Sequence, residues 1–378
     1  MMNNWNEYLA SLSPGAQERG AERTPAADGA VAAHAHFGTV LTVARLADGF
    51  VAPVGNLGLI AVHGADAATF LHGQLTNDVA NLPPGEVRLA GYCTPKGRLQ
   101  ATMTMWRAAG AGTVGVADAD VAVSPTIYLQ LPLAVQAAFQ KRLSMFVMRA
   151  KAKLVDATRE PGHAVVLGLG GARAEAALRA HVAALPPAPN TAAEGAHGTV
   201  LRLADAFGAP RYLWLTSEAT ALHALPALQQ TLALGGTDAW ELSGIHAGIA
   251  QVTPATLEQF VPQMINLELV GGVNFKKGCY PGQEIVARSQ YLGKLKRRTT
   301  LASIADPLAV AGAELFSLDD PLQPCGMVVN AAPNGAGGVD ALVEMKLAAL
   351  EQAVHLGSTT GARVAFLPMP YTLDALDL

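Results

Sequence analysis

The sequence predicts an α+β protein with more than one domain and a small all-β module at its C-terminal end. The chain has 378 residues, enough for two or three domains. Between residues 151 and 234 the patterns run β-β-α-β-β-α, an order typical of a permuted ferredoxin-like unit rather than a βαβ series. From about residue 295 onward short strand patterns alternate with turn signals, which indicates the all-β module.

The first elements follow from local patterns in chain order. "GLIAVHG" (58–64) is typical of a buried strand, and "ADAATFLHGQLTNDV" (65–79) has apolar residues at helical spacing. "VRLAGYCT" and "RLQATMTMWR" are predicted strands, joined as a hairpin by "PKG" (95–97). Residues 125–147 are predicted to be largely helical despite Pro132.

The later elements include the ferredoxin-like unit, with strands over 151–158 and 163–169 and helices over 172–185 and 218–234. "DAWELSGIHAGIAQV" (238–252) is a predicted amphipathic helix that returns the chain toward the first unit. "KLAALEQAVHLG" (346–357) fits either a helical insertion or a strand. Residues 1–37 are rich in Ala, Gly, Pro and charge with weak periodicity, so we expect a flexible N-terminal extension.

Composition excludes several classes of protein. The net charge is −4, which argues against nucleic-acid binding by bulk electrostatics, so direct nucleic-acid binding is not expected. The sequence has no apolar run of about eighteen residues, and we expect no membrane partner. Three widely spaced cysteines argue for a reducing compartment, and with no secretory signal pattern at the start they predict a cytoplasmic protein.

Basic residues are concentrated between residues 276 and 298. Seven of the 26 Lys and Arg residues fall in these 23 positions against one acid, Glu284, which gives a local net charge of +6. Such a concentration attracts anions, for which a carboxylate tail or a phosphate backbone are the natural candidates. The predicted anion-binding patch consists of Lys294, Lys296, Arg297 and Arg298.

Cys279 lies inside this basic stretch, in "NFKKGCYPGQEIVAR" (274–288). Neighbouring ammonium groups favour a thiolate over a thiol. Pro281 and Gly282 fit the two central positions of a type II turn. A lone cysteine is most often an inert core residue, but this setting predicts an exposed functional thiol on a turn. Cys93, which lies near Lys96 and Arg98, is the second candidate.

The segment "FVPQMINLELVGGVNFKKGCYPGQEIVAR" (260–288) resembles the signature of the YgfZ-type folate-binding proteins, whose core is K-G-C-Y-x-G-Q-E. The core is matched without a gap by Lys277, Gly278, Cys279, Tyr280, Gly282, Gln283 and Glu284. The lead-in is matched by Phe260, Pro262, Gln263, Asn266 and Leu267. A weaker likeness runs from about residue 50 to "PMPYTL". The family is related to the glycine-cleavage T protein.

The resemblance implies a ring-like arrangement of two ferredoxin-like α+β domains and a C-terminal β-barrel. On this basis residues 1–37 form the extension, and residues 38–147 with 238–294 form the first, folate-binding domain. Residues 148–237 form the second α+β domain, and residues 295–378 form the barrel. A monomer is expected.

The resemblance also implies a function: tetrahydrofolate bound in a central cavity, and support for the assembly or maintenance of iron–sulfur enzymes. Clients would include an enzyme that methylthiolates tRNA. Trp240 corresponds to a family aromatic that lies against the folate, and Gln263 and Asn266 are carried over as further folate-binding residues. Gln283 and Glu284 would orient the turn, and no resident metal is expected.

Two alternatives stay open. In the aminomethyltransferase relatives an aspartate assists methylene transfer, whereas "KGRLQAT" (96–102) carries Gln100 and Ala101 at the matching place. The chain therefore lacks that carboxylate for acid–base help, which favours folate binding over a folate-dependent aminomethyltransferase or demethylase. An RNA-binding module is the second alternative and rests on the basic stretch alone.

Overall fold

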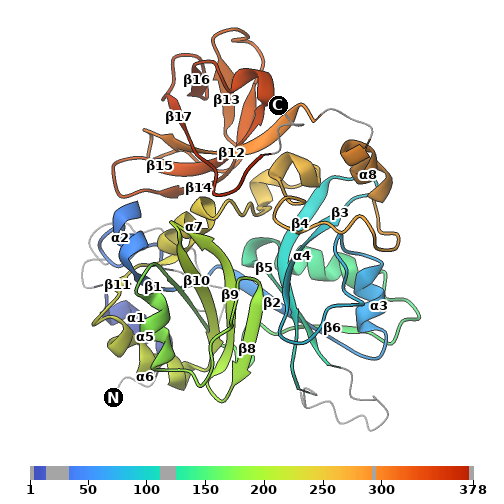
Figure 1. Ribbon diagram of the computed structural model, residues 1–378, viewed down its shortest axis with the longest axis vertical. Helices are drawn as coiled ribbons and strands as arrows, with labels where there is room; N and C mark the ends of the chain where they lie inside the picture. Colours follow the sequence, from blue (N-terminus) through green and yellow to red (C-terminus); the bar gives the residue numbers. More distant parts are fainter. Residues whose placement is uncertain (1–3, 14–33, 111–124, 292–294, 374–378) are drawn as a thin grey trace. The chain divides into compact units, whose positions relative to one another are not determined.

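The computed structural model describes most of the chain, namely residues 4–13, 34–110, 125–291 and 295–373. The chain divides into two compact units. Unit 1 comprises residues up to 57 together with 158–247 and 332–337, and unit 2 comprises 58–157, 248–331 and the chain from 338 onward. Both units combine sheets with helices (Figure 1), which confirms the predicted α+β class.

Unit 1 is built on a six-stranded sheet with the order β11-β1-β7-β10-β9-β8. Neighbouring strands are antiparallel except β1 and β11, which are parallel. The strands are β1 (Phe50–Pro53), β7 (Val165–Gly170), β8 (Thr191–Gly195), β9 (Gly198–Ala206), β10 (Ala209–Thr216) and β11 (Ala233–Leu234). β7 and β10 are almost wholly buried, as expected of strands with a neighbour on each side.

Helices pack on this sheet. They are α1 (Trp5–Ser11), α2 (Val43–Asp48), α5 (Ala174–Arg179), α6 (Glu218–Leu228) and α7 (Thr237–His246). Trp5 and Leu9 of α1 are buried in the same apolar core as Trp214 of β10. The expectation of a flexible extension is therefore wrong for α1, whose apolar residues are too few to show a clear period. Residues 14–33 of that extension lie outside the described residues.

Unit 2 contains a five-stranded sheet with the order β3-β4-β5-β2-β6. The strands are β2 (Leu57–His63), β3 (Val87–Cys93), β4 (Leu99–Arg107), β5 (Ile127–Pro132) and β6 (Lys153–Asp156). The predicted hairpin between β3 and β4 is confirmed. Its turn has Gly97 at φ +71°, and the Gly97 N–H donates to the Thr94 carbonyl at 2.9 Å.

Residues 125–147 differ from the helical prediction. Strand β5 occupies the first part of this segment, and helix α4 (Leu133–Ser144) follows it in the chain. "IYLQL" is rich in the β-branched and aromatic residues that favour strands, and Pro132, which lacks an N–H, stands where the helix begins. The remaining helical segments of unit 2 are α3 (Ala67–His72), α8 (Gln283–Tyr291) and the 3₁₀ turns η1 (Pro254–Thr256) and η2 (Pro262–Ile265).

Strand pairing groups two segments differently from the sequence expectation. β6, expected in the ferredoxin-like unit, pairs with β2, and β1, expected in the first domain, pairs with β7. Pairing over such sequence distances leaves no local signal. The predicted domain limits themselves stay a prediction.

The C-terminal part of unit 2 is a six-stranded sheet with the order β16-β13-β14-β15-β12-β17. The strands are β12 (Arg297–Ile304), β13 (Glu314–Ser317), β14 (Gly326–Pro333), β15 (Val339–Lys346), β16 (Val354–Leu356) and β17 (Val364–Leu367). An antiparallel bridge between His355 and Arg363 links the two ends, so the sheet is nearly closed and barrel-like. The ambiguous segment 346–357 forms η3 (Leu347–Ala349) and β16. The ring of three domains stays a prediction.

Candidate functional site: an anchored turn that exposes Cys279

The motif "KGCYPGQE" folds as a type II turn that leads into α8. The Gln283 N–H donates to the Tyr280 carbonyl at 3.2 Å across Pro281 and Gly282, and Gly282 has φ +82°. A Cβ atom at Gly282 would lie 2.4 Å from the Thr94 carbonyl oxygen of the β3–β4 turn. Glycine is therefore required both by conformation and by space, and the predicted turn is confirmed.

Lys277 anchors the turn to the end of α3. Its Nζ donates to the carbonyl oxygens of His72 and Leu75, the latter at 3.0 Å, and lies 4.8 Å from the centre of the Tyr280 ring. Burial lowers the pKa of Lys277 to about 8, although the charges of Asp78 and Cys279 favour its protonated form. Lys277 thus holds the backbone before Cys279 in place.

Cys279 itself is exposed, as the sequence predicts, whereas Cys93 and Cys325 are buried. Burial raises the pKa of Cys93 to about 12 and also raises that of Cys325. The expectation that Cys93 is a second reactive thiol is therefore wrong, because its side chain lies inside the sheet at the end of β3.

Gln283 and Glu284 begin α8. Glu284 pairs with Arg288 one turn later at 3.2 Å, an exposed i,i+4 pair. Val286 is the buried residue of this helix, and its carbonyl accepts a hydrogen bond from Gln263 Nε2 at 2.7 Å. Gln283 and Glu284, which follow the turn, are therefore part of helix α8.

Gln263 and Asn266 are fully buried in unit 2. Asn266 has a left-handed backbone (φ 57°), and its Nδ2 donates to the Thr299 carbonyl at 2.8 Å and to the Tyr371 hydroxyl at 3.3 Å. These bonds connect the segment before the motif to α8 and β12. The assignment of both residues to folate binding stays a prediction.

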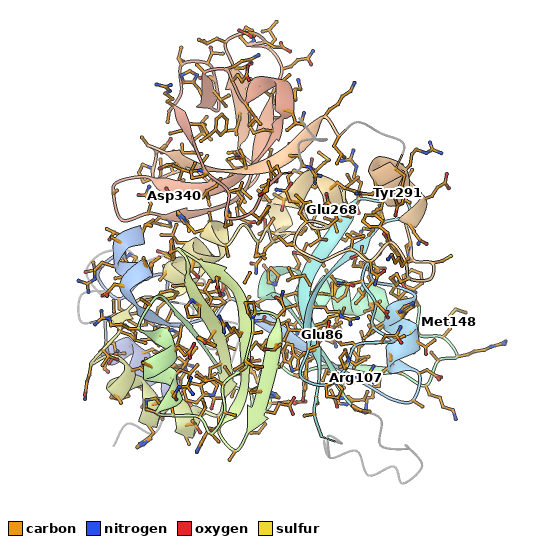
Figure 2. The ribbon with its side chains drawn as sticks, in the orientation of Figure 1. Glu86, Arg107, Met148, Glu268, Tyr291 and Asp340 are labelled. Carbon is orange, nitrogen blue, oxygen red and sulfur yellow. The ribbon has the colours of Figure 1, made fainter. Side chains whose placement is uncertain are left out.

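Only part of the predicted anion-binding patch is free of ion pairs within the described residues. Arg297 forms a two-pronged pair with Glu344, which is 1% exposed, and the Nη2–Oε2 distance is 2.8 Å. Arg298 is buried and pairs with Glu268, which Figure 2 labels. Lys296 is exposed, and Lys294 lies outside the described residues. Two of the four cations are thus neutralised by acids distant in sequence.

Trp240 belongs to α7 of unit 1 and is 5% exposed. The Arg211 guanidinium lies over its ring at 4.4 Å, and Gly168 of β7 lies so close that an added Cβ would be 2.3 Å from the ring. Arg211 donates to Ser243 Oγ at 3.0 Å and to the Ala204 carbonyl at 3.4 Å. Burial lowers its pKa to about 9, while the charge of Asp205 opposes this effect. A ligand at this place would meet an Arg–Trp pair rather than a bare ring.

Two carboxyls near Trp240 on α7 hold their protons unusually tightly. Burial raises the pKa of Glu241 to about 7, Asp238 adds to the rise, and a hydrogen bond from Asn56 Nδ2 at 2.6 Å opposes it. Burial likewise raises the pKa of Asp238 to about 6 against the opposing charge of His36. Neither acid stood out in the sequence, because acids in the first turns of a helix are ordinary.

Three further features, at His72, Gln100 and Arg211, were not predicted from the sequence. His72 Nδ1 lies 3.0 Å from Asp78 Oδ1, beside the cysteine motif. No signal in the sequence marks this pair, because a histidine at the end of a helix is an ordinary capping residue. Gln100 Nε2 donates to Glu258 Oε1 at 2.6 Å, so a carboxylate from another segment lies next to the position where the transferase relatives have an acid. Arg211 could have been noticed as a charge inside the apolar strand "APRYLWLT".

No family model matches the sequence. The chain is 30% identical over 320 residues to the tRNA-modifying protein YgfZ of Edwardsiella ictaluri, covering 83% of this chain and 90% of the relative. Proteins of the same name from Klebsiella pneumoniae (30%) and Escherichia coli (29%) match over 84% of this chain and 91% of their own length. The chain belongs to the YgfZ family. The resemblance first seen in residues 260–288 thus extends over most of the sequence.

A solved structure supports the fold of this YgfZ-family chain. The glycine cleavage system aminomethyltransferase T from Bartonella henselae aligns with a TM-score of 0.62 and 16% identity, covering 86% of each chain. Among the described residues no helix is both long and apolar enough to cross a membrane. Within the same ranges no three or more His, Cys, Asp or Glu side chains are grouped to hold a metal ion.

Proposed function

We propose that this YgfZ-family chain is a tetrahydrofolate-binding accessory protein that supports the assembly or maintenance of iron–sulfur enzymes, including enzymes that methylthiolate tRNA. The observation that carries the proposal is the anchored turn. Within unit 2 the side chain of Lys277 bonds the chain after α3 and lies over the Tyr280 ring, Gly282 gives the turn its backbone angles, and Cys279 is exposed. A tRNA-related role is supported by the name of the curated relatives, tRNA-modifying protein.

Arg211 and Trp240 are the residues of unit 1 that fit a folate. Folate combines a flat ring system with carbonyl and carboxylate acceptors. Arg211 is 4% exposed, and among the described residues no carboxylate forms an ion pair with it and no acceptor bonds its Nη2. A buried cation without an acid partner is costly, and a ligand acceptor would offset that cost. Lys294 and Lys296 stay candidates for binding an anionic partner through their charge.

The experiment that tests folate binding is a titration of the purified protein with tetrahydrofolate, followed by tryptophan fluorescence. We expect quenching in the wild type and affinity about tenfold weaker in Trp240→Ala, equivalent to about 1.4 kcal/mol. Trp106→Phe in unit 2 is the control and should bind as the wild type does. Unchanged affinity in Trp240→Ala would remove Trp240 from the site.

The thiol is tested with a client, an apo form of a tRNA methylthiotransferase whose activity is measured after incubation with this protein. One thiolate cannot hold a cluster alone, so further ligands would come from the client or a small thiol. Cys279→Ser should lose the support that the wild type gives, and Cys325→Ser, at a buried thiol, should keep it. Full support by Cys279→Ser would show that the thiol is not the functional group.

A folate-dependent one-carbon transferase is the second candidate, and the carboxylate of Glu258 beside Gln100 is the observation that favours testing it. Formation of formaldehyde or methylene-folate from N-methyl substrates, lost in Glu258→Gln, would support it. The RNA-binding alternative is weakened by the internal pairing of Arg297 and Arg298. A steep fall of tRNA affinity with salt would revive it.

A further inference from the structure

The imidazole of His72 lies between a carboxylate and the cysteine motif. His72 is the last residue of α3, and its Nδ1 is 3.0 Å from Asp78 Oδ1. Its other nitrogen faces the turn, because a Cβ built on Gly278 would lie 3.6 Å from His72 Nε2. Gly278 directly precedes Cys279. The two ring nitrogens therefore face an acid on one side and the backbone next to the thiol on the other.

The proton on this ring is assigned by its neighbours. The Ala80 N–H also points at Nδ1, at 3.3 Å, but one nitrogen cannot accept from Ala80 and donate to Asp78 together. The carboxylate is nearer, and a bare Nδ1 lone pair facing it would be repelled. Nδ1 thus carries the hydrogen, which leaves Nε2 of the neutral ring as the proton acceptor.

Asp78 is kept ionised and in place. It accepts hydrogen bonds from Asn81, at 3.0 Å from the backbone N–H and 2.8 Å from Nδ2. Burial by itself raises the pKa of Asp78, but these bonds and the charges of His72 and Arg88 outweigh burial and lower it. Arg88 donates to the Asp78 carbonyl at 2.6 Å and pairs at 2.6 Å with Glu86, which Figure 2 labels.

Lys277 links the backbone of His72 to the segment that carries Cys279. Its Nζ donates to the carbonyl of His72 itself, so the residue two before Cys279 is bonded to the residue that carries the ring. The charged groups around the ring are therefore Asp78, Lys277 and, behind Asp78, Arg88. Bonding of this kind fixes a base relative to its nucleophile, as in sites where a third group orients the base.

We propose that His72, positioned by Asp78, is the base that accepts the proton of Cys279 through one water and so generates the thiolate. The S–H bond breaks and an N–H bond forms at Nε2. The product is a thiolate beside an imidazolium that is paired with the Asp78 carboxylate, and no other reactant is needed. The inference rests on the proposed role of Cys279 as a functional thiol. It adds His72 as the group that activates this thiol.

The test is the rate at which iodoacetamide alkylates Cys279 in the full chain, followed by mass spectrometry of the Cys279 peptide from pH 5 to 9. His72→Gln keeps a polar side chain but cannot take a proton. We expect it to alkylate at least about tenfold more slowly at pH 7 and to lose the rise in rate near the titration of an imidazole. Asp78→Asn should also be slower at pH 7, and His223→Gln, an exposed histidine of unit 1, should match the wild type.

The same pH profile in His72→Gln as in the wild type, with the same melting temperature, overturns the proposal. If that variant does not fold, Asp78→Asn decides, because asparagine keeps the size of the side chain and removes the charge that orients His72. An alkylation profile of Asp78→Asn equal to that of the wild type also overturns the proposal. Failure of the proposed function would be seen in a different experiment. There, Cys279→Ser would support the client enzyme fully, whatever the pH profile of alkylation.

Discussion

Replacing Glu241 with glutamine should make the protein more stable at neutral and alkaline pH. Glu241 lies on α7 in a partly buried position, accepts a hydrogen bond from Asn56 at 2.6 Å and is near Asp238. Glutamine retains the carbonyl oxygen that accepts from Asn56 and has no charge. It therefore mimics the protonated acid, which is the form that this environment favours.

The size and sign follow from the pKa of Glu241, which is raised from 4.5 to about 7, mainly by burial. The stability contributed by the bound proton is fully present below pH 4.5 and is lost as the pH rises through 7. One pKa unit corresponds to about 1.4 kcal/mol, so the gap is equivalent to about 3 kcal/mol. Because part of the side chain reaches solvent, screening should reduce the observed gain to about 1 to 2 kcal/mol.

The assay is thermal unfolding followed by tryptophan fluorescence at pH 4.5, 6 and 8. Glu241→Gln should match the wild type at pH 4.5 and melt several degrees higher at pH 8. Glu351→Gln, at an exposed glutamate, is the control and should change little at any of these pH values. A difference that stays constant between pH 4.5 and 8, or a less stable variant at pH 8, would refute the reasoning.

Two further substitutions probe unit 2 by equilibrium unfolding in urea. Gly282→Ala combines a positive φ with a Cβ placed 2.4 Å from the Thr94 carbonyl oxygen, and should cost about 2 kcal/mol or more. Gly271→Ala is the control, because Gly271 has a similar φ of +77° and open space around an added Cβ. Its loss of unfolding free energy should be smaller, since it reflects backbone strain alone. Equal losses in the two variants would contradict the clash at Gly282. Arg298→Met removes the cation that pairs with the buried carboxylate of Glu268 and should cost about 3 kcal/mol. Adding Glu268→Gln should recover most of that loss, and no recovery would show that the cost is packing rather than charge.

Local signals predicted much of the fold and of the motif. The hairpin between β3 and β4 and the type II turn at Pro281 and Gly282 were visible because glycine and proline specify backbone angles within a few residues. The exposure of Cys279 followed from the same turn. Such features need no knowledge of distant segments.

Long-range pairing could not be read in the same way. Seven cations with one acid looked like an open patch, yet Arg297 and Arg298 meet Glu344 and Glu268, which are 47 and 30 residues away in the chain. The role of His72 was hidden for the same reason, since Gly278 is brought to its ring only by the folding of unit 2. A sequence shows which groups exist, and tertiary structure decides which charges remain to be satisfied.

The position of β1 affects how this protein can be made and divided. β1 lies between β7 and β11, yet it is synthesised about 110 residues before β7. At the usual speed of synthesis β1 waits on the order of ten seconds for its partner, and its four buried residues are open to aggregation or a chaperone meanwhile. A fragment that begins at residue 148 would lack β1 and turn the apolar β7 into a bare sheet edge, and would carry β6 without β2. Soluble expression is therefore expected from the undivided chain rather than from pieces cut between consecutive strands.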